Sequence, residues 1–126
     1  MIQSAIPVLS VTDSRRSEEF YCNMLGFQRL FAYRPDPGKD DPCYLGMARD
    51  GVTLHLHSFK PERAGKTDAF LWVEDVDQLY QELISRGVIF VIPPTDQIWG
   101  DRETHVRDPD GNALCFGMHR KTQPAI

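Results

Sequence analysis

The chain has 126 residues, of which 41% are hydrophobic and 25% charged, and its formal net charge is −4. That length suits a single globular domain, and a negative chain has no bulk attraction to nucleic acid or anionic lipid. No apolar run approaches the ~18 residues of a membrane span. Three cysteines without metal-binding spacing do not predict a disulfide framework. We therefore expect a cytoplasmic protein with neither a nucleic-acid nor a membrane partner.

The first half of the chain predicts one strand, one helix and three more strands. Residues 4–11 contain β-branched residues typical of a strand. Asp13 or Ser14 is a suitable helix cap, and Gly26 fits the left-handed stop of that helix. Asp50-Gly51 is a two-residue hairpin signal between alternating segments. The further strands are expected at residues 27–33, 43–49 and 52–58.

The second half repeats that order, beginning with a strand at residues 69–73. A helix is expected to begin at Asp75 and to end at Gly87. Its buried face should consist of Leu79, Tyr80, Leu83 and Ile84. A strand at 88–92 is expected to stop at Pro93-Pro94. The last strands are expected near residues 102–107 and 113–118.

The acidic segment Asp108-Pro109-Asp110-Gly111-Asn112 joins those last two strands. Proline presets φ, glycine supplies positive φ, and the Asp and Asn side chains bond nearby backbone groups. We therefore interpret the segment as a turn and not as a metal site.

The order of elements is β-α-β-β-β twice, which predicts an α+β fold. We expect one domain over residues 1–126, with one module at about 1–60 and a second at about 67–119. Each four-stranded sheet should carry its helix on one face. The other face must be covered or must line a cavity.

The order and spacing of several short motifs resemble one known family. They are Val11-Thr12-Asp13 with Phe20-Tyr21 and Leu25-Gly26-Phe27, then Phe70 to Val73 with Leu79-Tyr80, and finally Trp99 to Glu103 followed by Val106 to Asn112. This pattern is similar to the vicinal-oxygen-chelate superfamily of glyoxalases, extradiol dioxygenases and bleomycin-resistance proteins, and most similar to the last group. The resemblance implies curved mixed sheets that form an open cup with the helices outside. It also implies a homodimer whose clefts take residues from both chains.

Enzymes of that superfamily hold a divalent metal ion with one side chain from each of four strands. The resemblance places the corresponding positions at Ile6, His55, Asp68 and Cys115. Ile6 has a hydrocarbon side chain and cannot ligate a metal. The other three could supply nitrogen, oxygen and sulfur ligands, a set that favours zinc. We expect no cofactor, and keep a divalent metal at these three residues as the alternative.

The expected cup face carries the candidate ligand-binding residues. His55 and His57 alternate along one strand, and Phe70 and Trp72 along another, so each pair shares a face. Such aromatic side chains suit flat rings and cations, although they could equally fill the cup. Glu103 and His105 also share a strand face and could transfer protons. Further candidates are Phe31, Tyr33 and Tyr44 on the walls and Trp99 in a loop at the mouth.

The two long loops and their ends are rich in carboxylates, which could draw in a cation or simply be solvated. They are Asp36, Asp40, Asp41, Asp96, Asp101 and Glu103.

Three functions are compatible with these residues. The leading hypothesis is a non-catalytic, dimeric small-molecule-binding protein that sequesters an aromatic, cationic, antibiotic-like ligand. The second is a metal-dependent lyase, isomerase or dioxygenase that uses His55, Asp68 and Cys115. The third is a structural or regulatory module with a filled cup.

Overall fold

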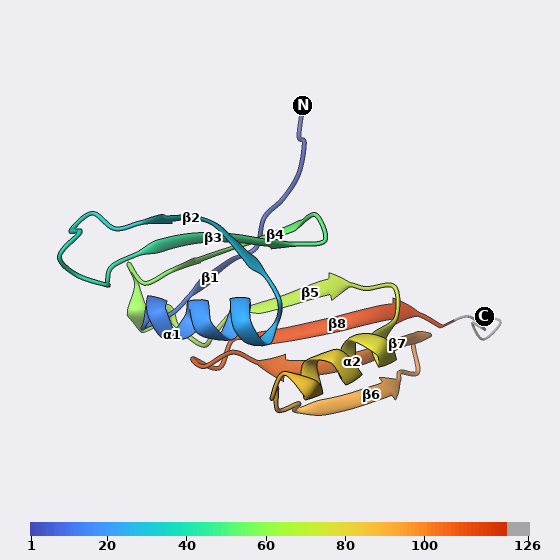
Figure 1. Ribbon diagram of the computed structural model, residues 1–126. Helices are drawn as coiled ribbons and strands as arrows, with labels where there is room; N and C mark the ends of the chain where they lie inside the picture. Colours follow the sequence, from blue (N-terminus) through green and yellow to red (C-terminus); the bar gives the residue numbers. More distant parts are fainter. Residues whose placement is uncertain (121–126) are drawn as a thin grey trace.

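The computed structural model describes residues 1–120 and consists of two four-stranded mixed sheets, each with a helix (Figure 1). The first half contains β1 (Val8–Ser10), α1 (Ser14–Glu18), a π-helical turn (Glu19–Met24), β2 (Gln28–Tyr33), β3 (Tyr44–Arg49) and β4 (Val52–His57). A 3-10 turn (Pro61–Arg63) leads to the second half, which contains β5 (Asp68–Trp72), α2 (Val76–Ser85), β6 (Ile92–Asp96), β7 (Asp101–Arg107) and β8 (Ala113–His119). None of the helices within residues 1–120 is long and apolar enough to cross a membrane.

The strands of the two sheets follow the same order. The first sheet is arranged β1-β4-β3-β2 and the second β5-β8-β7-β6. In each sheet the first and last strands of the half pair in parallel, and the remaining pairs are antiparallel. The predicted α+β fold of two βαβββ halves is therefore confirmed.

Local sequence signals explain where the helices begin and end. The side chains of Asp13 and Asp75 accept hydrogen bonds from the backbone N–H groups of Arg16 and Gln78, three residues into each helix. Gly26 and Gly87, which follow the two helices, have φ values of 79° and 90°. These conformations favour glycine, as the sequence predicts.

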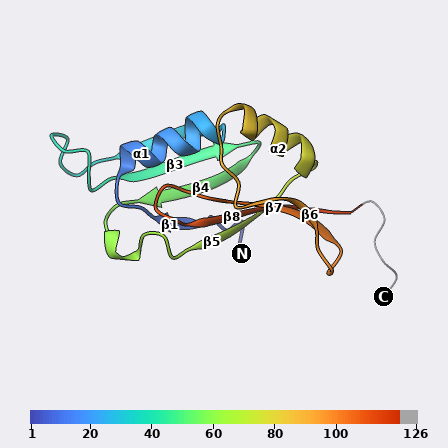
Figure 2. The ribbon, with the colours of Figure 1, turned by 90° about the horizontal axis from the view of Figure 1, so that it is seen from below.

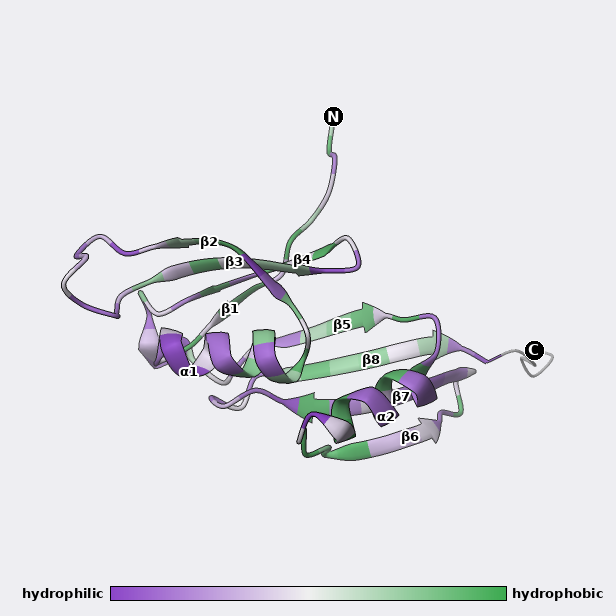
Figure 3. Cartoon of the chain, viewed as in Figure 1, coloured by the Kyte–Doolittle hydropathy of each residue, from purple (hydrophilic) through white to green (hydrophobic). Residues whose placement is uncertain are grey.

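The helix-covered faces of the two sheets contribute to one hydrophobic core. Leu9 and Leu56 come from the first sheet, Leu114 and Phe116 come from the second, and Tyr21 lies on the π-helical turn that follows α1. Figure 2 shows α1 and α2 on one side of the molecule, and Figure 3 shows that β5 and β8 are hydrophobic over much of their length. Because the two halves share their helix-covered sides, the opposite face of each sheet points away from this core.

The predicted turn at residues 108–112 also fastens the two halves together. Asp108 accepts hydrogen bonds from the backbone N–H groups of Asp110 and Asn112, which confirms the turn. Its second carboxylate oxygen accepts one from the hydroxyl of Tyr21, at 2.9 Å. The side chain of Asn112 donates to the backbone carbonyl of Ser10. A turn of the second half thus satisfies buried polar groups of the first half.

The first strand is shorter than expected. It covers Val8–Ser10 instead of residues 4–11, so Ile6 lies before it. The pairing with β4 starts at Pro7, whose carbonyl accepts from the N–H of His55. Figure 1 shows the segment before this point leading away from the sheets. The sequence pattern continues upstream, but no neighbouring strand within residues 1–120 pairs with it.

Two expectations about the second half are wrong. The strand expected at residues 88–92 lies at Ile92–Asp96 instead, so β6 contains Pro93 and Pro94. It is an edge strand whose register shifts between Ile92 and Thr95, so the prolines stand where no regular ladder hydrogen bond is needed. On α2, Ile84 is 44% exposed, because Leu83 and Val76 fill the contact with the core instead.

Candidate ligand-binding faces

Each sheet has an uncovered face lined with aromatic side chains. The uncovered face of the first sheet is called the first-half face. It carries Phe31, Tyr33, Tyr44, His55 and His57 on β2, β3 and β4. The uncovered face of the second sheet is called the second-half face. It carries Phe70, Trp72, Glu103, His105 and Cys115 on β5, β7 and β8, together with Trp99 in the loop before β7. All ten predicted ligand-binding residues lie on these two faces, with five on each side.

Rings on the first-half face form a continuous row. Phe31 and Tyr44 are nearly parallel, with centroids 6.2 Å apart, and Tyr44 and His57 are nearly parallel at 5.6 Å. The Tyr44 hydroxyl and the Nδ1 atom of His55 are hydrogen-bonded at 3.0 Å. Burial, together with the charges of Lys60 and Arg63, lowers the pKa of His57 below its ordinary value. The neutral form of the His57 ring is therefore favoured, which suits packing against flat groups.

Aromatic side chains also gather at the edge of the second-half face. The Phe70 and Trp72 centroids are 4.7 Å apart, and those of Trp72 and His119 are 4.4 Å apart. The Nδ1 atom of His119 is 3.0 Å from a carboxylate oxygen of Asp101. Phe70 is 45% exposed and Trp72 is 55% exposed, so neither ring fills a core.

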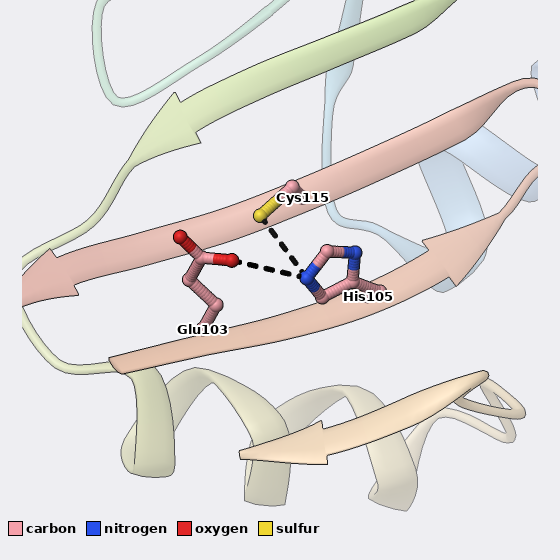
Figure 4. Close-up of side chains that lie close together, drawn as sticks. All are labelled: Glu103, His105 and Cys115. Carbon is pink, nitrogen blue, oxygen red and sulfur yellow. Dashed lines mark hydrogen bonds and ion pairs between the residues drawn. The ribbon is translucent and has the colours of Figure 1, made fainter. Parts of the chain in front are cut away.

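A polar cluster lies in the middle of the second-half face (Figure 4). The Nε2 atom of His105 is 3.2 Å from one carboxylate oxygen of Glu103 and 3.5 Å from the sulfur of Cys115. The other oxygen of Glu103 accepts a hydrogen bond from the Trp99 indole at 3.0 Å. Burial and the neighbouring Glu103 carboxylate raise the pKa of Cys115 to about 12. The thiol is therefore protonated at neutral pH, which argues against a nucleophilic cysteine.

The metal-ligand set implied by the resemblance is spread over both faces. His55 lies on β4 in the first sheet, whereas Asp68 and Cys115 lie on β5 and β8 in the second. Within residues 1–120, the group of three ligand atoms that lie within 4.8 Å of one another is Glu103, His105 and Cys115, which shares only Cys115 with that set. His55, Asp68 and Cys115 remain a prediction, and Ile6 supplies no ligand atom.

Several loop carboxylates expected at the rim already have basic partners. Asp40 pairs with Arg15, and Asp96 pairs with Arg102. Glu103 differs, because it is only 5% exposed and its hydrogen-bond partners are Trp99 and His105. Among the predicted carboxylates, Glu103 and Asp101, which precedes it by two residues on β7, therefore belong to the second-half face itself.

Two glycines on these faces escaped the sequence prediction. The space that a Cβ atom would occupy at Gly46 is taken by the Phe31 ring, with its Cε2 atom nearest. At Gly117 the same space is taken by the Phe70 ring, with Cζ at 2.5 Å. A glycine in the middle of a strand is the signal that could have revealed them, since it marks a close approach. In each half, one phenylalanine ring thus lies over a glycine of the neighbouring strand.

A groove of about 620 Å³ lies on a different part of the molecule, between the two halves. It is lined by residues such as Leu25, Phe27, Arg49, Leu79 and Glu82. Arg49 donates to the carbonyl of Leu25 and to the carboxylate of Glu82, so the polar wall is occupied by internal contacts. Apart from Trp72, the predicted ligand-binding residues do not line it.

The repeated βαβββ sheets and their uncovered aromatic faces define the chain as an α+β protein of the βαβββ-repeat class. More particularly, it belongs to the Glyoxalase/Bleomycin resistance protein/Dioxygenase superfamily, whose family model matches residues 4–116.

Several relatives of the chain are named for bleomycin resistance or antibiotic binding. It is 31% identical to bleomycin resistance proteins of Geobacillus stearothermophilus and Staphylococcus aureus, over 97% of this chain and 100% of each relative. A bleomycin-binding protein from Streptomyces verticillus, complexed with copper(II)-bleomycin, is 28% identical, with a TM-score of 0.76 over 95% of this chain and 98% of that one. TnmS3, an antibiotic-binding protein from Streptomyces sp. CB03234, is also 28% identical, with a TM-score of 0.74 over 95% and 99%. These relatives support a binding role in the superfamily.

Proposed function

We propose that this chain is a non-catalytic binding protein that sequesters an aromatic, cationic, antibiotic-like compound. The observation that carries the proposal is the pair of exposed phenylalanine rings, Phe31 and Phe70, each seated on a strand glycine of an uncovered face. Large exposed aromatic surfaces of this kind mark interaction sites in soluble proteins. The relatives that carry the names of bleomycin resistance and antibiotic binding support a compound of that class.

The chemistry of the two faces explains the preference for flat cations. Exposed rings such as Phe31 and Trp72 offer stacking surfaces worth about 0.5–1.5 kcal/mol for each well-placed pair. The faces of Trp72 and Trp99 can also attract a cation. The carboxylate of Glu103 adds negative charge with little solvent around it, where charges interact more strongly than in water. Stacking and charge suffice for capture, so the binding step needs no cofactor.

A homodimer would turn these open faces into clefts. The first-half and second-half faces of one chain both point away from the shared core, and so neither closes over the other. A two-fold axis could place the first-half face of one copy opposite the second-half face of its partner, which creates two equivalent clefts. We propose that the ligand binds there. Free thiols at all three cysteines, Cys22, Cys43 and Cys115, support a reducing cytoplasmic setting.

Titration of the tryptophan fluorescence with metal-free bleomycin tests this proposal. We expect quenching that saturates at micromolar drug or below, and loss of part of the signal in Trp72→Phe and in Trp99→Phe. Sedimentation of the free chain should give the mass of two copies. Absence of quenching at micromolar drug would exclude bleomycin, and a monomer that binds drug with full affinity would exclude the dimer cleft.

A further inference from the structure

The cluster of Glu103, His105 and Cys115 has the composition of a metal site. Glu103 and His105 stand two residues apart on β7, and Cys115 is paired directly with His105 on the neighbouring strand β8. Figure 4 shows the three side chains pointing toward one another. Their ligand atoms lie within 4.8 Å of one another.

Two of the three distances between the ligand atoms are close to those of a tetrahedral zinc site, and the third is within 4.8 Å. Zinc binds nitrogen and oxygen at about 2.0–2.2 Å and sulfur at about 2.3 Å, so neighbouring ligand atoms lie roughly 3.3 Å apart for N and O and 3.6 Å for N and S. The observed separations are 3.2 Å between Glu103 and His105 and 3.5 Å between His105 and Cys115. An ion could therefore enter with small adjustments of the side chains.

The surroundings hold these ligands in place. β7 is paired on both sides, with β8 and with β6, so its backbone is fixed within the sheet. The Trp99 indole donates to the outer oxygen of Glu103 and leaves the inner one directed at His105. Such support from a neighbouring donor is typical of metal ligands. Glu103 is buried, whereas the side chain of His105 is 30% exposed, so the cluster is reached from the uncovered face.

We propose that Glu103, His105 and Cys115 bind one divalent ion of borderline softness, of which zinc is the representative. Carboxylate, imidazole and thiolate form the mixed set that zinc accepts, while magnesium and calcium prefer oxygen alone. On binding, Cys115 gives up its proton to the solvent and coordinates as the thiolate. Three protein ligands leave a fourth position open toward the second-half face, for water or for a donor atom of a bound molecule.

Titration of the tag-free, chelator-treated chain with zinc, against a chromophoric competitor, tests the site directly. We expect one zinc ion per chain, and affinity at least about tenfold weaker in Cys115→Ser and in His105→Gln. Glu103→Gln should weaken binding in the same direction. Cys22→Ser is the matched control, because Cys22 is another half-buried free thiol but lies in the first half. It should bind zinc as the parent chain does.

The absorption spectrum of the cobalt-loaded chain reports directly whether the Cys115 sulfur binds the metal ion. The cobalt-loaded parent and the Cys22→Ser variant should show a thiolate-to-cobalt charge-transfer band, and Cys115→Ser should lack it. Zinc should raise the Tm of the parent but not of Cys115→Ser, a comparison that also verifies that the variant folds. No stoichiometric zinc, or equal affinity in the parent and Cys115→Ser, would overturn the site. Since no drug is present, this failure is independent of bleomycin binding.

Discussion

The two halves of the chain have the same strand order but different uncovered faces. The first-half face presents a row of rings with two histidines, beside the basic residues Lys60 and Arg63. The second-half face presents a buried carboxylate, Glu103, among Trp99, His105 and a thiol. The helix-covered sides are alike, because both must fill one core. The repeat therefore preserves the fold through one side of each sheet and leaves the other side free to diverge.

The largest effect should come from the turn that joins the halves. Asp108→Ala removes the acceptor for Tyr21 and for two backbone N–H groups, in a buried or partly buried setting. We expect a loss of about 3 kcal/mol in the free energy of unfolding, because buried donors are left unsatisfied. Urea denaturation measures this loss.

The matched control for that substitution is Asp40→Ala. Asp40 is an exposed carboxylate paired with Arg15, and its removal should cost less than about 1 kcal/mol. Equal losses in the two variants would show that the turn does not fasten one half to the other.

The next largest effect should come from the glycines beneath the Phe31 and Phe70 rings. In Gly46→Ala and Gly117→Ala the new Cβ would collide with the ring of Phe31 or Phe70, which must swing out. Because both rings are partly exposed, we expect the free energy of unfolding to fall by no more than about 3 kcal/mol. We also expect at least tenfold weaker bleomycin binding, about 1.4 kcal/mol, in either variant.

Calorimetric titration with metal-free bleomycin measures that change, and Gly38→Ala, in the loop between β2 and β3, is the control. If only one of the two strand glycines mattered, the ligand would contact a single face, and the proposed cleft between two copies would be wrong.

The smallest effect should appear in the acid response at the other junction of the halves. The hydrogen bond from Arg49 lowers the pKa of Glu82 below its ordinary value. A lowered carboxyl pKa contributes stability above the unfolded pKa of about 4.3 and loses it as the pH falls through the folded pKa. Glu82→Gln should therefore lessen the loss of stability on acidification below about pH 5.

At neutral pH the same substitution should cost no more than about 1 kcal/mol, because the pair is partly exposed. Urea denaturation at neutral and acidic pH tests both statements, with the exposed Glu62→Gln as control. An unchanged acid response in Glu82→Gln would show that the pair of Arg49 and Glu82 does not stabilise the junction of the halves.

Much of the fold could be predicted from local signals. Asp13 and Asp75 as caps, Gly26 and Gly87 as stops, and the hairpin at Asp50-Gly51 all depend on nearby backbone groups. Two features could not be predicted in this way. Tertiary packing overrides local preference at the π-helical turn Glu19–Met24, and an edge position does so for the prolines inside β6.

The candidate site was predicted less completely. Strand alternation correctly placed the aromatic residues of each strand on a single face of its sheet, because side chains alternate between the two faces with a period of two residues. The proximity of Cys115 to His105 depends on the register of β7 against β8, which the sequence does not specify. Trp99 reaches Glu103 only because the loop before β7 turns back at Gly100, where φ is 101°.

Binding of the ligand on the two uncovered faces is tested by calorimetric titration of metal-free bleomycin into the parent chain and three variants. Phe31→Ala and Phe70→Ala change the two uncovered faces, while Gln78→Ala changes the competing groove between the halves. We predict that both phenylalanine variants bind at least tenfold more weakly and that Gln78→Ala binds as the parent does. Retained binding in both phenylalanine variants, with loss in Gln78→Ala, would contradict the account.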